Sequence, residues 1–362
     1  MSGSVILPLY LTNAYLVGIA LWLATGGLAM VGLLKLRRAW RGNPRRLRCV
    51  NLGLSCWLFA GCITLLELYL AFFYDSSDSF NQTHVSKRWF HRQVVNNDEG
   101  FRDDHPFDQR VPAGVQRICF LGDSFTFGHG INDVRNRFSD RVAAELEQAR
   151  PGKFAVNNLG QPGWNPVMNY GLMKNLVEKE FDVHTIVHTF CLNDIEAFED
   201  RSGRYYRELG RHYSDAFLVK YTYTCNLAYY RLLQLRQPEL RNYYNFVRDS
   251  YDGQAWDRMQ DLLREMHQFA RSNKIDLRMV IFPFVHNLGP NYPYEEAHRK
   301  LVEFCEAENT PVLDLLPVLN PHANEGLTVS AFDAHPNERA HALAADAIRR
   351  QLLSDLFQPD TK

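Results

Sequence analysis

The stretch RICFLGDSFTFGHG occupies residues 117–130 of a chain of 362 residues. Its first residues are mostly apolar and predict a short buried strand, which ends in a tight polar turn, Gly-Asp-Ser. Such a turn suits a phosphate-binding loop, a plain turn or a serine nucleophile. A P-loop needs a Lys and a Ser or Thr after its last glycine, and a dinucleotide fingerprint needs a glycine where Asp133 stands. Phosphate binding is therefore disfavoured.

Strand and helix patterns alternate from this stretch to the end of the chain. Such alternation predicts a parallel sheet with helices on both faces, and ligands in such folds bind at the carboxyl ends of the strands. Ser124, Asn193 and Asp194 fall at those ends. The expected strands are 117–121, 154–160, 185–194, 277–284 and 311–316, and the expected helices are 137–149, 165–181, 255–274, 292–309 and 337–357.

Two long apolar runs precede this region. Residues 5–34 carry no charge, and residues 50–73 contain only Glu67. Each run exceeds the roughly 20 residues that span the hydrocarbon core of a bilayer. A secretory signal peptide fits the first run poorly, because no basic residue precedes the run and it is too long for a signal. The pattern predicts a two-helix transmembrane hairpin at residues 1–74.

The loop between the two runs is strongly basic, with seven Lys and Arg residues between positions 35 and 48. A short loop of this kind is retained in the cytoplasm. The expected topology is a two-pass protein of the cell (inner) membrane, with both termini and everything after residue 74 outside the cytoplasm. Glu67 is then either an interfacial carboxylate that reaches headgroup water or a contact with another membrane protein. The net charge of −1 gives no reason to expect a nucleic-acid partner.

The part outside the membrane divides by composition. Residues 75–116 are polar and rich in turn residues, which predicts a linker and an irregular lead-in. A large domain, 117–362, follows. It is interrupted at about 195–252 by a segment that holds ten of the protein's seventeen tyrosines. This insertion is either a lid that supplies substrate-binding side chains or a helical outgrowth whose tyrosines pack together or lie at the level of the lipid headgroups.

A serine hydroxyl needs a base to take its proton and an acid to orient that base. The stretch FDAHPNERAH, residues 332–341, offers both. His335 precedes an expected helix, and Asp333 lies two residues before it. An order with serine early and aspartate and histidine late is one of several that build a catalytic triad. The sequence therefore predicts that Ser124, His335 and Asp333 act together.

Four short motifs resemble the conserved blocks of the SGNH (GDSL-type) hydrolase superfamily. They are Gly122-Asp123-Ser124, Gly163, Asn193-Asp194, and Asp333 with His335. The resemblance implies a flavodoxin-like three-layer α/β/α sandwich and ester hydrolysis or acyl transfer without cofactor or metal. It also implies a catalytic role for Ser124, His335 and Asp333. The implied oxyanion hole consists of the backbone N–H groups of Ser124 and Gly163 and the side-chain amide of Asn193.

Two positions depart from the family pattern. Cys191 stands where the third block usually has glycine, which is expected to change the packing beneath Asn193. Asp333 precedes His335 by two residues instead of three, so a backbone carbonyl is an alternative partner for the imidazole. Cys and His residues show no ligand spacing typical of a metal site.

The leading hypothesis is a membrane-anchored serine esterase that acts outside the cytoplasm on acyl esters of envelope or secreted glycans. Acetyl esters are the expected substrates among these. An O-acyltransferase that works with an integral membrane partner is one alternative. A glycan-binding scaffold without activity is the other. The expected partners are the lipid bilayer and an acylated glycan or another ester substrate.

Overall fold

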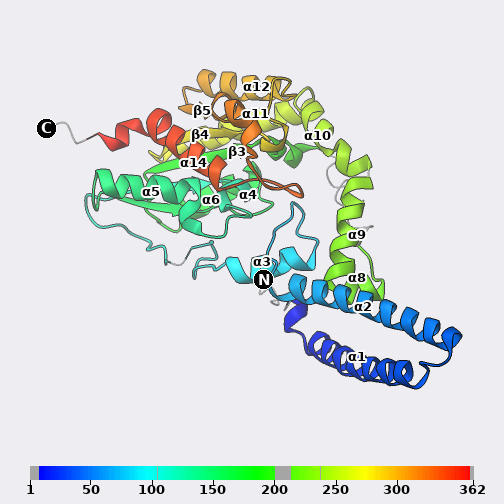
Figure 1. Ribbon diagram of the computed structural model, residues 1–362. Coiled ribbons are helices and arrows are strands. Elements are labelled where there is room, and N and C mark those ends of the chain that lie inside the picture. Colours follow the sequence, from blue (N-terminus) through cyan, green and yellow to red (C-terminus); the bar gives the residue numbers. More distant parts are fainter. Residues whose placement is uncertain (1–7, 104, 200–212, 237, 359–362) are drawn as a thin grey trace. The chain divides into compact units, whose positions relative to one another are not determined.

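A computed structural model describes residues 8–103, 105–199, 213–236 and 238–358 (Figure 1). The chain folds into two compact units. The N-terminal unit combines Met1–Arg92 with Tyr213–Arg236. The other unit combines Gln93–His212 with Gln237–Lys362 and is called the catalytic unit because it contains the predicted catalytic residues Ser124, Asp333 and His335. The expected insertion at 195–252 is thus divided between the two units.

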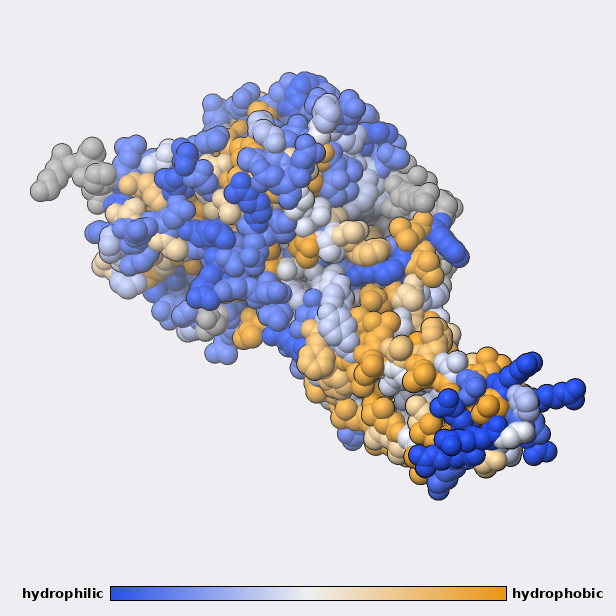
Figure 2. Space-filling view, in the orientation of Figure 1, coloured by the Kyte–Doolittle hydropathy of each residue, from blue (hydrophilic) through white to orange (hydrophobic). Residues whose placement is uncertain are grey.

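Two long antiparallel helices dominate the N-terminal unit. They are α1 (Asn13–Ala39) and α2 (Pro44–Phe72), and the side chains of Thr12 and Asn43 cap their N-termini. Both helices are long and apolar enough to cross a membrane, and only 6% of the most apolar window of each is buried. In Figure 2, hydrophobic residues cover the hairpin and hydrophilic residues gather at the turn that joins its helices. An α/β fold preceded by an apolar hairpin is the predicted architecture, and it is confirmed.

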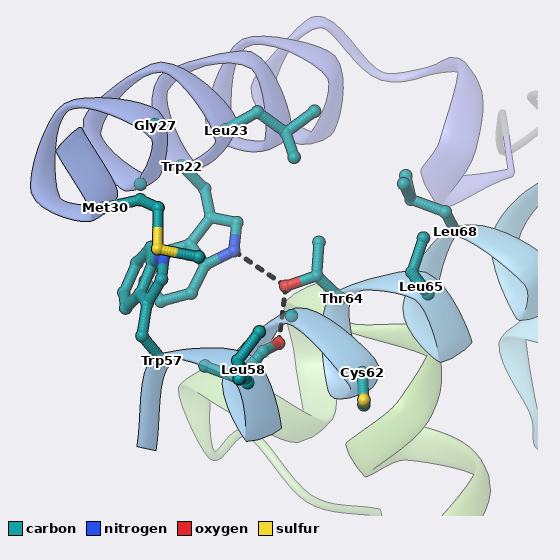
Figure 3. Close-up of a pocket in the computed structure, with 13 residues that line it drawn as sticks. Trp22, Leu23, Gly27, Met30, Trp57, Leu58, Cys62, Thr64, Leu65 and Leu68 are labelled. Atoms are coloured by element: carbon teal, nitrogen blue, oxygen red, sulfur yellow. Dashed lines mark hydrogen bonds between the residues drawn. The ribbon is translucent and has the colours of Figure 1, made fainter. Parts of the chain in front are cut away.

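A pocket of about 420 Å³ lies between α1 and α2 (Figure 3). The Trp22 indole donates a hydrogen bond of 2.9 Å to Thr64 Oγ1, which in turn donates to the carbonyl of Ala60. A Cβ on Gly26 would come within 2.7 Å of the Trp57 ring, so only glycine lets that ring approach α1. The walls of the pocket are otherwise apolar.

The expected irregular lead-in contains a regular element, α3 (His84–Gln93). Thr83 caps this short helix, because its hydroxyl oxygen accepts a hydrogen bond from the N–H of Ser86. Asp78 holds this cap in place, since its carboxylate accepts hydrogen bonds from the N–H and the hydroxyl of Thr83. From α3, the fully buried Arg88 donates to the carbonyls of Leu70 and Tyr74 at the C-terminal end of α2. These contacts join α3 to the hairpin.

Glu67 meets neither sequence expectation. It is 6% exposed, and its carboxylate accepts hydrogen bonds from the Tyr15 hydroxyl at 2.8 Å and from the backbone N–H groups of Tyr223 and Thr224, both at 2.7 Å. Tyr223 and Thr224 begin α9 (Tyr223–Arg236), which follows α8 (Phe217–Tyr221). The first N–H groups of a helix lack partners within the helix and carry a partial positive charge. Glu67 is therefore the N-terminal cap of α9.

The catalytic unit is built on a five-stranded parallel sheet in the order β2-β1-β3-β4-β5. This order fits the predicted flavodoxin-like sandwich: β2 lies on one side of β1, and β3, β4 and β5 follow on the other side, so the switch in strand order falls between β1 and β3. β1 and β3 pair in a register that sets Cys119 beside Ile186. The strands are β1 (Gln116–Leu121), β2 (Phe154–Asn158), β3 (Thr185–Cys191), β4 (Asp276–Phe282) and β5 (Val312–Asp314).

Helices cover both faces of this sheet (Figure 1). One layer contains α14 (Glu338–Ala347), which packs on α5 (Phe138–Ala149). The opposite layer contains α6 (Pro166–Glu178), which packs on α11 (Gln254–Ser272), and also α12 (Glu295–Ala307). The expected last helix, 337–357, is regular only to Ala347 and continues as a π turn and a 3-10 turn. The shorter elements are α4 (Ser124–Phe127), α10 (Pro238–Ser250), α13 (Leu316–Leu319), β6 (Thr328–Ser330), β7 (Asp333–Pro336) and 3-10 turns at Leu9–Leu11, Val134–Asn136, Leu192–Phe198, Val285–Asn287, Asn320–Glu325 and Ser354–Phe357.

The tyrosines of the insertion follow the division between the units. Tyr205 and Tyr206 lie outside the described residues. Tyr223, fully buried, packs with Tyr10 and Tyr15 of the hairpin, whereas Tyr251 belongs to the core of the catalytic unit. The insertion is thus not a single element. Of the other tyrosines of the insertion, the N-terminal unit contains Tyr213, Tyr221, Tyr229 and Tyr230, and the catalytic unit contains Tyr243 and Tyr244.

Candidate active site

Ser124 lies in a sharp turn between the buried strand β1 and the short helix α4. A Cβ on Gly122 would lie 2.2 Å from Thr126 Oγ1 and 2.8 Å from the carbonyl oxygen of Thr189, so this turn accepts only glycine. Asp123 caps α4 by accepting a hydrogen bond of 2.8 Å from the N–H of Phe125. The turn places Ser124, which is partly exposed, at the carboxyl edge of the sheet.

His335 and Asp333 lie on β7, which pairs in antiparallel fashion with β6. His335 Nε2 is 2.8 Å from Ser124 Oγ, and His335 Nδ1 is 2.5 Å from Asp333 Oδ1. Residues i and i+2 of an extended strand point to the same side. The spacing of two residues therefore suits a strand, and the carboxylate of Asp333, not a backbone carbonyl, is the partner of the imidazole. The structure thus brings the three predicted residues together.

The three side chains differ in their exposure to solvent. Asp333 is fully buried, and the His335 side chain is 10% exposed. A buried carboxylate that accepts the Nδ1 proton leaves the Nε2 lone pair to face the serine hydroxyl. That tautomer is assigned from the two contacts. The arrangement can take a proton from Ser124 and hold the imidazolium that results.

His129 is a further member of the site, although it is not among the predicted catalytic residues. Its ring stacks on that of His335, with ring centroids 4.1 Å apart and planes 14° apart, and its Nε2 is 3.7 Å from Asp333 Oδ2. Asp333 thus faces an imidazole with each of its oxygens. The only signal in the sequence was the position of His129, five residues after Ser124.

Donor atoms of His129, Asp333 and His335 lie within 4.8 Å of one another, a distance that a metal site also shows. The stacked rings direct the lone pairs of their nitrogens along nearly parallel planes, so these lone pairs do not converge on one point. Both nitrogens of His335 already contact Ser124 and Asp333. Among the described residues, this group therefore fits a stacked pair of imidazoles better than a metal site.

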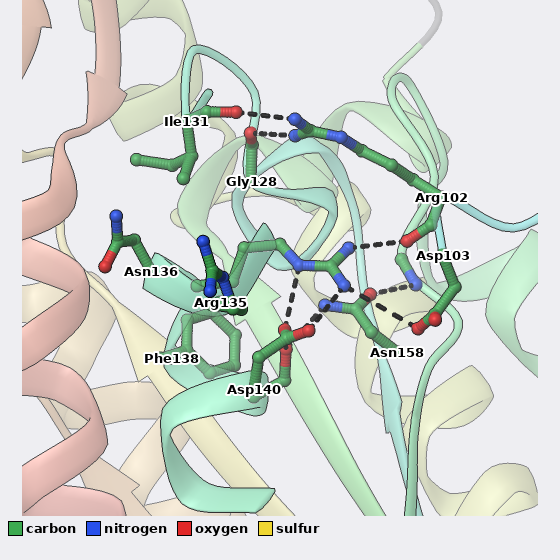
Figure 4. Close-up of polar contacts among 12 residues, drawn as sticks. Arg102, Asp103, Gly128, Ile131, Arg135, Asn136, Phe138, Asp140 and Asn158 are labelled. Carbon is green, nitrogen blue, oxygen red and sulfur yellow. Dashed lines mark hydrogen bonds and ion pairs between the residues drawn. The ribbon is translucent and has the colours of Figure 1, made fainter. Parts of the chain in front are cut away.

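Two buried arginines, Arg102 and Arg137, hold the loop that carries His129. Figure 4 shows Arg102 beside Gly128 and Ile131 of this loop. Arg102 donates hydrogen bonds to the carbonyls of Gly128 at 2.7 Å and Ile131 at 2.6 Å. Arg137 donates to the carbonyl of Arg102 and pairs with Asp140 at 2.8 Å. Charge-assisted bonds of this kind restrain a backbone more strongly than neutral ones. A residue of the lead-in segment thus restrains the loop that includes His129.

The predicted oxyanion donors follow three neighbouring strands. The Ser124 N–H comes after β1, Gly163 after β2 and Asn193 after β3. Gly163 is exposed and has a φ of +75°, a left-handed conformation that suits glycine. Asn193 Oδ1 is buried, and among the described residues it has no hydrogen-bond partner. The roles of the three donors stay predictions.

Two carboxyls lie beneath the site. Burial raises the pKa of Asp123 to about 6. Burial and the neighbouring Asp123 raise the pKa of Asp194 well above its usual range. Asp194 accepts a hydrogen bond of 3.0 Å from the N–H of Cys191 and so shapes the turn that carries Asn193. Burial also raises the pKa of the Cys191 thiol, which makes this residue an inert packing group where the family usually has glycine.

No curated protein matches the chain. A structure of a G-D-S-L family lipolytic protein from Veillonella parvula DSM 2008 is 16% identical, with 65% of this chain and 97% of that chain covered and a TM-score of 0.40. A catalytic mutant of an acetylxylan esterase from Geobacillus stearothermophilus is 15% identical, with 68% and 96% covered and a TM-score of 0.40.

A two-domain esterase active on acetylated mannans is 18% identical, with 69% of this chain covered and a TM-score of 0.40. The match spans about half of that protein, 53% of its chain. The family model of the GDSL-like lipases/acylhydrolases matches residues 120–343, more than half of this chain. The match includes Ser124, Asn193, Asp333 and His335. The chain therefore belongs to the GDSL-like lipase/acylhydrolase family, and this membership supports an ester hydrolase.

Proposed function

We propose that this protein is a membrane-anchored serine esterase that removes acyl groups from envelope or secreted glycans outside the cytoplasm. Acetyl groups are the expected acyl groups. The observation that carries the proposal is the hydrogen-bonded chain from Ser124 through His335 to Asp333. A serine that contacts a histidine, which in turn contacts a buried carboxylate, is the arrangement that activates a hydroxyl for attack on a carbonyl carbon.

The chemistry follows from these contacts. Ser124 Oγ attacks the ester carbonyl carbon while His335 Nε2 takes its proton, and Asp333 stabilises the imidazolium. The oxyanion is held by the N–H groups of Ser124 and Gly163 and the amide of Asn193. The bond to the alcohol oxygen then breaks, and His335 returns the proton to that oxygen. Water attacks the acyl-enzyme by the same route and releases the acid and free Ser124.

The hairpin supports the membrane part of the proposal. In α1 and α2 large apolar side chains point outward, such as Leu28 at 74%, Phe59 at 68% and Leu65 at 68% exposed. Each square ångström of apolar surface in water costs roughly 25 cal/mol, so a lipid environment is favoured. The basic turn between the helices favours the topology in which the catalytic unit lies outside. Acylated envelope and secreted glycans are esters found in that compartment.

The pocket between α1 and α2 favours an O-acyltransferase as the second candidate. Gly26, Gly27 and Gly61 line this pocket, and small residues let a further membrane helix approach closely. A partner docked there would supply acyl groups, and Ser124 would pass them to a sugar hydroxyl instead of water. An acceptor glycan that becomes acylated faster than the acyl-enzyme is hydrolysed would establish this alternative.

The test is labelling of the full-length protein in nanodiscs by a fluorophosphonate, together with hydrolysis of p-nitrophenyl acetate. We expect the wild type to be labelled at Ser124 and active. Ser124→Ala should lose both properties, and His335→Ala should lose most of its activity. Ser354→Ala is the matched control, because Ser354 is an exposed serine outside the site. Folded wild-type protein that is neither labelled nor active would refute both enzymatic functions and leave the glycan-binding scaffold.

A further inference from the structure

The short helix α8 of the N-terminal unit exposes an unusual set of side chains. Phe217 is 73% exposed, Leu218 57% and Tyr221 40%. The rings of Phe217 and Tyr221 contact each other with centroids 5.1 Å apart. Lys220 extends from the same turn and lies 3.9 Å from Asp215. Three large apolar side chains on one five-residue helix form a patch that water solvates poorly.

Side chains of the N-terminal unit hold the backbone of α8 in place. Asn226 Nδ2 donates to the carbonyl of Val219 at 3.0 Å, and His84 Nε2 lies 2.9 Å from the carbonyl of Lys220. Asn226 Oδ1 also accepts from the N–H of His84 at 2.8 Å. The last carbonyls of a helix lack partners within the helix, and in water the solvent would bind them. Here side chains of the same unit bind them, so these carbonyls do not depend on water for their hydrogen bonds.

Glu67 sets the position of this segment along the hairpin. Its carboxylate binds the first N–H groups of α9, and α8 ends just before those groups. Glu67 lies five residues before Phe72, the last residue of α2, which corresponds to about 7.5 Å along the helix axis. Side chains of α2 near this level also point outward, with Leu65 at 68%, Leu66 at 46% and Tyr69 at 51% exposed.

We propose that α8 lies in the interface of the bilayer and inserts Phe217, Leu218 and Tyr221 among the lipids. Tyrosine is enriched where headgroups meet acyl chains, which suits Tyr221, and the Lys220 amine can reach water from that level. The α8 patch is thus a third lipid contact, next to α1 and α2. The inference rests on a hairpin that spans the membrane, but not on which side of the membrane the catalytic unit lies.

The test uses the full chain in nanodiscs of phosphatidylcholine, with an environment-sensitive fluorescent amino acid at one position at a time. We expect the emission maximum of the probe at position 217 to be shifted to shorter wavelength than in water. Its fluorescence should be quenched at least twofold more by lipids brominated near the headgroup than by aqueous iodide. Position 235 is the matched control, because Leu235, 55% exposed, lies near the far end of α9. A probe there should respond to iodide.

A probe at position 58 in α2 separates the two levels of the proposal. If brominated lipids quench the probe at position 58 while only iodide quenches the probe at position 217, the proposed interfacial role of α8 is wrong, but the membrane anchor is supported. If neither reports lipid, the membrane anchor itself is wrong. A second readout is Phe217→Ser combined with Leu218→Ser, which should weaken retention on lipid during mild detergent extraction and leave ester hydrolysis unchanged.

Discussion

Each unit of the protein contains a buried carboxylate that accepts hydrogen bonds from donors of the same unit. Glu67 of the N-terminal unit is 6% exposed and binds two backbone N–H groups and a tyrosine hydroxyl. Asp333 of the catalytic unit is fully buried and faces the imidazoles of His335 and His129. A buried charge must be compensated in either case. Amide donors cannot take up a proton near neutral pH, whereas an imidazole can, so one carboxylate joins helices and the other supports proton transfer.

Asp333→Asn gives the largest effect expected from this comparison. The amide keeps the shape of the side chain but cannot stabilise the imidazolium or select the right tautomer of His335. We expect kcat for an acetyl ester to fall by about 10²–10⁴-fold with little change in KM. Steady-state kinetics of the protein in nanodiscs measures this. Glu67→Gln is the matched control and should keep kcat within twofold. A similar loss of kcat in Asp333→Asn and Glu67→Gln would show that the two carboxylates do not differ in function.

Glu67→Gln tests the structural half of the comparison. The neutral amide loses the charge that matches the N-terminus of α9, so the N-terminal unit should lose about 2 kcal/mol of stability. Limited proteolysis within residues 213–236 should become faster, while the reactivity of Ser124 towards a fluorophosphonate stays unchanged. Unchanged cleavage of this segment would show that α9 does not depend on its cap.

Asp123 makes the stability of the catalytic unit depend on pH. Its pKa is raised from 3.8 in the unfolded chain to about 6 by burial, so the folded protein binds this proton more tightly. The stability that the protonated group contributes is present below about pH 4 and is lost as the pH rises through about 6. Hydrogen exchange of the β1 and β3 amides between pH 4 and pH 7 measures the trend. Asp123→Asn should flatten it, and an equal slope in this variant would assign the trend to another group.

His129→Phe tests the second imidazole at Asp333. Phenylalanine keeps a ring that can stack on His335 but removes the Nε2 that faces Asp333 Oδ2. We expect kcat to fall about tenfold at constant KM, the loss of one weak contact to the catalytic carboxylate. His129→Gln, which can still donate a hydrogen bond, should recover part of the loss. Equal kcat in the wild type, His129→Phe and His129→Gln would show that His129 contributes only to packing and not to catalysis.

Local patterns were sufficient for much of the fold and for part of the site. The period of apolar residues located the five strands and their helices, and the Gly-Asp-Ser turn located Ser124, because these signals involve neighbours in the chain. The pairing of Asp333 with His335 was also predicted, since both lie in one motif. The spacing of two residues became understandable only when β7 was seen to be a strand.

The tertiary structure alone revealed the role of Glu67, the stacking of His129 on His335, and the division of the tyrosine-rich segment between the two units. Glu67 and Tyr223 are 156 residues apart. Composition places tyrosines in a segment but does not say which surface they cover. A hydrophobic period reports which face of an element is buried, whereas the partner of a buried polar group depends on how distant elements pack. The sequence therefore determined the elements and the nucleophile, and packing decided what each buried charge does.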